Sequence, residues 1–174
     1  MNIKQNLVKK SKAQEKSLKI RNEYWPQLKQ DDIWDRKKHK GFTTIPRTIA
    51  ITMSIMDSLS KGKPLGQTYF VLWCHVYDDS FLIIDNPSTY VAEAGFTGER
   101  ALTTWSSRMK SLQDLGFIDC KEGASGKFHY VLIKNPHLVI WQLKDKIQER
   151  LFRQLLDRAL DVGAKDMSDG SSTI

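Results

Sequence analysis

The strongest pattern of apolar and polar positions lies near the middle of the chain, between Gly98 and Gly116. Apolar residues recur there at spacings of three and four, at Leu102, Trp105, Met109, Leu112 and Leu115. Such spacing places them on one face of an α-helix that turns toward a core. We therefore expect a helix over residues 98–115, ended by Gly116.

Three shorter elements precede this helix. Residues 67–77 form a continuous apolar and aromatic run, whose periodicity alone fits either a helix or a strand. Because the run exceeds ten residues, we favour a helix. Residues 81–84 are β-branched and aromatic, which predicts a short strand. We expect Ser88 to cap a short helix that runs through Ala94 and closes at Gly95.

A hairpin is expected after the central helix. Residues 117–133 alternate between apolar and polar positions on both sides of the segment 122–126, which contains two glycines. This pattern is typical of two antiparallel strands, here joined by a five-residue loop.

Two helices flank this central region. Residues 42–59 place Pro46 near a first helical turn, which predicts a helix of about three turns. Residues 138–160 carry Ile140, Leu143, Ile147, Leu151, Leu155 and Leu156 at near-helical spacing. We interpret them as one long amphipathic helix. The predicted parts are a basic, partly flexible helical arm (1–40), the central domain with its preceding helix (41–136), the C-terminal helix (137–162) and a disordered tail (163–174).

Charge is distributed unevenly along the chain. Of its 27 Lys and Arg residues, 12 lie in residues 1–40 against 5 Asp and Glu, whereas residues 41–174 hold 15 of each sign. The formal net charge of +7 therefore resides in the arm. A basic arm beside a neutral body suggests a polyanionic partner, because neutralised phosphates release counterions. An anionic membrane surface would attract such an arm equally well.

The remaining sequence features predict a cytoplasmic protein without a membrane span. No apolar run reaches the ~18 residues that cross a bilayer, and residues 1–21 lack the apolar stretch of a signal peptide. Cys74 and Cys120 lie far apart in apolar elements, which favours reduced, buried thiols over a disulfide.

The order helix, short strand, short helix, turn, long helix and hairpin over residues 67–133 resembles the winged helix-turn-helix superfamily. Residues 87–96 look like its supporting helix and turn, residues 97–100 like the opening of its recognition helix, and Leu-Gly-Phe-Ile at 115–118 like the entry to its wing. The resemblance implies an α+β, mostly α fold with a three-stranded wing sheet and extra N- and C-terminal helices. It also implies double-stranded DNA as the partner.

In this reading the central helix carries the DNA contacts. If its apolar stripe faces the core, helical geometry turns Arg100, Thr103, Thr104, Ser107, Arg108 and Ser111 outward. Arg100 could pair with guanine in the major groove, and Lys121 and Lys127 flank the wing loop, where they could bind phosphate. The alternative is an ordinary solvated helix face and two charges that keep a hairpin soluble. His129 is as suited to packing as to contact.

The functional hypothesis is a sequence-specific double-stranded DNA-binding protein, a transcription regulator of bacterial or mobile-element type located with the nucleoid. The apolar face of the C-terminal helix, called the seam below, could pack on the chain's own domain or pair with a second copy of the chain. We favour the second alternative, a homodimer that binds two DNA half-sites. One alternative is a plasmid- or phage-type replication or partition initiator. Another is a winged-helix protein-interaction module without DNA binding.

Enzymatic chemistry is not expected. Neither glycine-containing segment, 61–66 or 125–127, matches a phosphate-binding loop. Cys and His residues lack the close pairs of a zinc site, and no local nucleophile signature is present. We therefore expect no cofactor, no metal and no catalytic residues.

Overall fold

The computed structural model describes residues 12–168 and divides the chain into two compact units, residues 1–42 and 43–174. The first unit contains α1 (Lys12–Tyr24) and a single 3₁₀ turn, η1 (Gln30–Asp32). The predicted arm is thus helical over α1, while residues 1–11 lie outside the described residues. Its flexibility stays a prediction.

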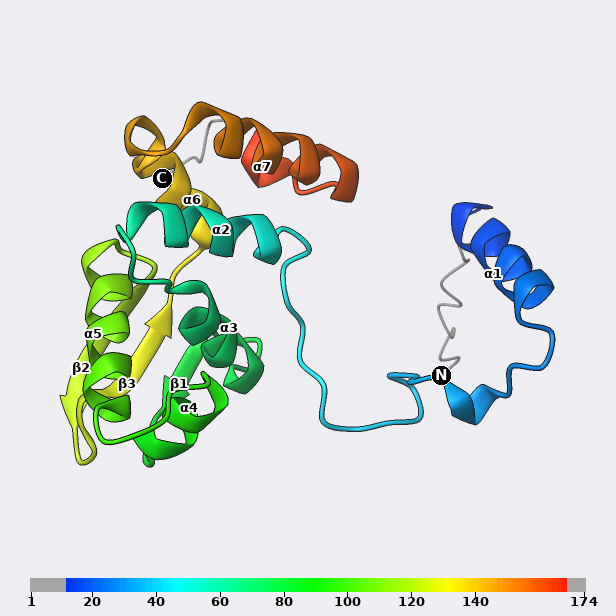
Figure 1. Cartoon of the computed structure of the whole chain (residues 1–174). Coiled ribbons are helices and arrows are strands. Elements are labelled where there is room, and N and C mark those ends of the chain that lie inside the picture. The colour runs from blue at the N-terminus through cyan, green and yellow to red at the C-terminus, as the bar shows by residue number, and fades with distance from the viewer. Residues whose placement is uncertain (1–11, 169–174) are drawn as a thin grey trace, which may run out of the picture. The chain divides into compact units, whose positions relative to one another are not determined.

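The second unit carries the remaining elements (Figure 1). They are α2 (Ile49–Leu59), α3 (Gly66–His75), β1 (Phe81–Ile83), α4 (Pro87–Glu93), α5 (Ala101–Asp114), β2 (Ile118–Gly123), β3 (Gly126–Ile133), α6 (Pro136–Gln142), η2 (Lys144–Lys146), α7 (Glu149–Val162) and α8 (Lys165–Ser168). The predicted α+β class is confirmed. No helix between residues 12 and 168 has both the length and the apolar character to cross a bilayer.

The sheet is antiparallel, with strand order β1-β3-β2. Val131 of the central strand lies opposite Leu82 of β1 and Cys120 of β2, and all three side chains are buried. Residues of opposite parity form an outer face, on which Phe81 stacks on Tyr130. This alternation is the period-two pattern expected of a sheet with one buried face.

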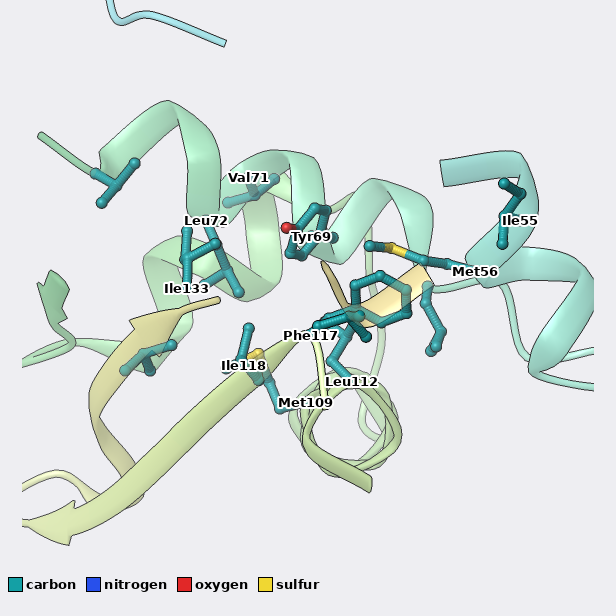
Figure 2. Packing of buried hydrophobic residues seen from close by; sticks show 14 of the residues in the cluster. Ile55, Met56, Tyr69, Val71, Leu72, Met109, Leu112, Phe117, Ile118 and Ile133 are labelled. Carbon is teal, nitrogen blue, oxygen red and sulfur yellow. The ribbon is translucent and has the colours of Figure 1, made fainter. Parts of the chain in front are cut away.

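The core lies between the inner sheet face and the helices (Figure 2). Tyr69 of α3 meets Phe117 edge-on, with ring centroids 5.9 Å apart, and Met109 and Leu112 of α5 are fully buried. Because α3 is buried on several sides, residues 67–77 are apolar without a clear period. Their helical conformation, left open by periodicity, agrees with the length argument.

Two predicted helix starts were wrong, both because of local backbone chemistry. α5 begins at Ala101 and not at Gly98, whose φ of 81° lies outside the α region. α4 is capped by Asn86, whose side chain accepts from the N–H of Ser88, and Pro87 takes the first helical position. The predicted closure of this helix by Gly95 agrees with its φ of 78°.

The predicted five-residue hairpin loop was also wrong. β2 runs to Gly123 and β3 begins at Gly126, so only Ala124 and Ser125 connect them. Gly126 has a φ of 114°, which glycine adopts readily, and the register shifts between Lys121 and Gly123. The two glycines therefore belong to the strands.

The predicted single C-terminal helix is interrupted between α6 and α7. Ile147 has extended backbone and is buried, and Gln148, with a ψ of 128°, is also non-helical, so the chain changes direction there. α7 then lies against α2, and Phe152, Leu155 and Ala159 are buried within the chain's own core. The apolar seam on which the homodimer prediction rested is thus packed against the chain's own domain.

The predicted disordered tail begins as ordered structure. Gly163 ends α7 with a φ of 73°, and α8 follows, with Met167 fully buried in the core. One turn of helix therefore belongs to the folded unit. Residues 169–174 of the predicted tail lie outside the described residues.

The two cysteines are free but differ in environment. Cys120 is buried on β2, and burial, aided by the nearby Asp119 carboxylate, raises the pKa of its thiol to about 12. Cys74 was predicted to be buried but is exposed, because it lies on the outer side of α3. Partial desolvation and Glu93 also raise its pKa.

We expect a thiol-reactive dye at about pH 8 to label Cys74 in the folded protein and Cys120 only after unfolding, since the thiolate is the nucleophile. Mass spectrometry before and after denaturation would count the labels. Two labels on the folded protein would contradict the burial of Cys120.

The same burial predicts a dependence of stability on pH. The folded state holds the Cys120 proton more tightly than the unfolded chain, so the free energy of unfolding should fall as pH rises above about 9.

Candidate nucleic-acid interface

A tight turn sets the position of α5 after α4. The N–H of Phe96 donates to the carbonyl of Val91 at 3.1 Å, and Gly95 takes a positive φ beside it. Gly98 makes the second bend, and the N–H of Ala101 donates to its carbonyl at 3.1 Å. The two glycines thus let the chain change direction within a few residues, so that α5 begins soon after α4 and packs against it.

α5 buries one face in the core. It contacts α3, α4 and β2, and its buried residues are Trp105, Met109 and Leu112. Figure 1 shows α5 beside the β2–β3 hairpin. Leu102, which was predicted to face the core, is 52% exposed because it lies in the first turn, beyond the end of the core.

The predicted contact residues of α5 fall into two groups. Arg100, at the N-cap position, and Thr103 are exposed. The half-buried group consists of Thr104, Ser107, Arg108 and Ser111. The prediction that all six side chains point outward was therefore wrong for this second group, which other segments partly cover. Ser111, for example, lies beside residues 59–63.

Two members of the half-buried group are constrained. The Ser111 hydroxyl donates to the carbonyl of Ser107 at 3.0 Å, as serines in helices often do. The Nε atom of Arg108 is buried without a hydrogen-bond partner among the described residues. The start of α5 thus offers the freest donors of the predicted set.

Exposed Lys110 was missed by the sequence analysis. It lies seven residues after Thr103, and therefore on the same helical face. Its ammonium lies 2.9 Å from the Asp114 carboxylate, an exposed pair of the i,i+4 kind. Helical spacing alone could have identified it.

The hairpin adds two exposed lysines to this surface. Lys121 on β2 and Lys127 on β3 are both exposed. Residues 100–134 hold six Lys or Arg against three Asp or Glu, although residues 41–174 as a whole are balanced. Within the hairpin itself, residues 118–133, the two lysines are balanced by two acidic residues, so the local excess comes from α5 and from the residues just before and after these elements.

A shallow hollow lies between α5 and the hairpin. It has a volume of about 220 Å³, and Leu102, Ser106 and Lys127 are among its lining residues. Trp105 and Phe128 meet edge-on beneath it, with ring centroids 5.8 Å apart. The helix and the hairpin therefore share an apolar contact that fixes their spacing.

His129 holds the hairpin tip. Its side chain is 5% exposed, and its Nδ1 lies 2.8 Å from the Ser125 hydroxyl and 3.2 Å from the carbonyl of Ile84. The Ser125 hydroxyl also donates to that carbonyl. The imidazole ring fills the space that a Cβ on Gly123 would need. His129 is therefore a packed residue, which sequence reasoning had left undecided.

A second cluster has the connectivity of a hydrolase triad. His137 places Nε2 2.8 Å from the Thr48 hydroxyl and Nδ1 2.6 Å from the Asp166 carboxylate. Thr48, however, is 1% exposed at the N-cap of α2, so a substrate has no access to its hydroxyl. We assign the cluster to joining α2, α6 and α8.

Among residues 12–168, no group of three or more His, Cys, Asp or Glu side chains is placed to hold a metal ion. No family model, curated protein or solved structure matches the chain. The geometry of α5 and the hairpin is therefore the basis for assigning a function.

Proposed function

We propose that Gly66 to Ile133 form a winged helix-turn-helix domain that binds double-stranded DNA, with α5 as recognition helix and the β2–β3 hairpin as wing. The observation that carries the proposal is the element order α3, β1, α4, α5, β2, β3 combined with the sheet order β1-β3-β2. This arrangement leaves the outer face of α5 beside a hairpin that carries two exposed lysines. An α-helix of this kind fits the major groove of B-DNA.

Arg100 and Thr103 are the proposed base readers. Recognition helices use residues near their N-terminus to contact base edges, and both side chains are exposed there. The planar fork of arginine matches the two acceptors of guanine. The half-buried hydroxyls of Thr104, Ser107 and Ser111 are better placed for phosphate or sugar contacts. The partly buried Arg108 would position the helix.

Lys121 and Lys127 are the proposed phosphate contacts of the wing. Such contacts set the register of a protein on DNA but carry no sequence information. Each phosphate that is neutralised steepens the dependence of affinity on salt by about one logarithmic unit per decade. Alanine at either lysine should therefore weaken binding to all duplexes alike. A role in transcription regulation stays a prediction.

We expect Arg100→Ala to weaken binding to a duplex selected from a random pool by about 5- to 150-fold, because one bidentate contact contributes about 1–3 kcal/mol of discrimination. Binding to unselected duplex should change much less. Fluorescence anisotropy over a salt series, with the full chain and with residues 43–174, would measure both. Arg150→Ala, an exposed arginine on α7, is the matched control.

The proposal fails if Arg100→Ala and Lys127→Ala behave as Arg150→Ala does on every duplex. It also fails if residues 43–174 retain no duplex binding while remaining folded. Either result would favour the protein-interaction hypothesis, in which a protein partner binds at the exposed Leu102 and the hollow beside it.

A further inference from the structure

The first unit contains a hollow that the proposed duplex interface does not use. It lies between α1 and residues 33–37 and has a volume of about 630 Å³, within the range of small-ligand sites. Half-buried Leu18 and Ile33 form apolar parts of its lining, and Arg21, Trp34, Arg36 and Lys37 supply positive charge and an aromatic ring.

Trp34 is open to solvent but held in place. Its side chain is 60% exposed. The ring meets Phe42 edge-on at 6.0 Å, and His39 lies nearly parallel to it, also at 6.0 Å between centroids. Two neighbouring rings therefore restrict the indole while much of its surface stays accessible.

A local turn carries Arg36 and Lys37, which line the same hollow as Trp34. The Asp35 carboxylate accepts from the N–H of Lys37 at 2.9 Å, and the N–H of Asp35 donates to His39 Nδ1 at 3.1 Å. The acidic side chain thus shapes the turn. Arg36 lies over the Phe42 ring, 5.5 Å from its centroid.

Residues 33–42 hold four Lys or Arg against one acidic residue. Lys38 pairs with Asp31 at 3.2 Å, an exposed contact. The Arg21 guanidinium donates to the Asn22 side chain at 3.0 and 3.2 Å, which fixes its direction at the edge of the hollow. Fixed cations beside an exposed ring match the chemistry of a nucleotide, which joins a flat base to a phosphate.

A single strand fits this surface better than a duplex or a bilayer. In a duplex the base faces are stacked on one another, whereas an unpaired base can stack on an aromatic side chain while phosphates follow a basic groove. A helix that lies on a membrane needs a large apolar face. α1 offers only a few apolar residues, among them Leu18 and the exposed Ile20.

We propose that this hollow binds single-stranded nucleic acid, with one base stacked on Trp34 and adjacent phosphates held by Arg21, Arg36 and Lys37. The site lies entirely within residues 18–37 and does not depend on the duplex-binding role of α5. The basic arm would therefore bind a different ligand from the duplex proposed for α5.

The test uses the full chain and a fluorescent oligothymidylate, with an abasic strand of equal length as a ligand that has phosphates but no bases. Trp34→Ala should weaken oligothymidylate binding at least about fivefold and leave abasic binding unchanged. Trp34→Phe should retain most of the affinity. Trp25→Ala removes another exposed tryptophan, outside the hollow, and should match the wild type.

Charge and base contributions can be separated further. Arg36→Gln combined with Lys37→Gln should weaken binding of both strands and reduce the salt dependence, while Arg150→Ala, at an exposed arginine on α7, should leave both unchanged. The proposal is overturned if oligothymidylate and abasic strands bind equally well, or if Trp34→Ala has no effect on either. Binding of anionic phospholipid vesicles through Trp34, without oligonucleotide binding, would assign the surface to a membrane instead.

Discussion

Replacing Leu155 with alanine is expected to lower the free energy of unfolding by about 2–5 kcal/mol, the range for large buried aliphatic residues. Leu155 is fully buried on α7, which contacts α2, so its removal leaves a cavity inside the second unit. Urea unfolding followed by circular dichroism would measure the loss. The result would show that the C-terminal helices contribute to the stability of the folded body.

Leu160 provides the matched control, because it lies on the same helix but is 66% exposed. Leu160→Ala should change the free energy of unfolding by no more than about 0.5 kcal/mol. Equal effects at both positions would contradict the docking of α7. A Leu155→Ala effect that varies with protein concentration would instead indicate that the seam joins two copies, as the homodimer prediction required.

Gly123→Ala is expected to destabilise the protein by about 2–4 kcal/mol. The added methyl group would overlap the imidazole of His129, which cannot move without losing its contacts to Ser125 and Ile84. Steric overpacking of a tight site costs about 1–3 kcal/mol, and each broken hydrogen bond about 1 kcal/mol more. Chemical denaturation gives the total, and amide exchange in β2 and β3 would locate it.

A double-mutant cycle tests the cause. With His129→Ala in place, the ring is gone and Gly123→Ala should add little further destabilisation. The coupling energy should therefore reach about 1–3 kcal/mol. Additive effects of the two substitutions would mean that the ring and the glycine do not compete for the same space.

Sequence periodicity predicted the elements better than their ends. The spacing of Trp105, Met109 and Leu112 identified the buried face of α5, because a helical face follows directly from the residues that share it. Leu102 fits the same spacing but is exposed, since periodicity does not indicate where along the helix axis the core stops. Ile147 fits the helical spacing of the predicted C-terminal helix, but its backbone is extended, because it lies at the break before α7.

The candidate sites depended more on tertiary structure. Exposure of Arg100 and Thr103 followed from helix geometry, but the partial burial of Ser107 and Ser111 depends on segments that are distant in sequence. His129, Ser125 and Ile84 meet only after β1 pairs with β3. The hollow around Trp34 similarly requires α1 and residues 33–37 to come together, which no local pattern indicates.

The contact between Ser125 and Ile84 also affects the conformational entropy of any complex that the hairpin forms. Ordering a free loop residue costs about 1–2 kcal/mol of backbone entropy. Because Ser125 and His129 already fix the tip to the end of β1, this ordering takes place when the protein folds. A ligand that meets the hairpin therefore finds a rigid surface, and its binding free energy is not reduced by immobilising the tip.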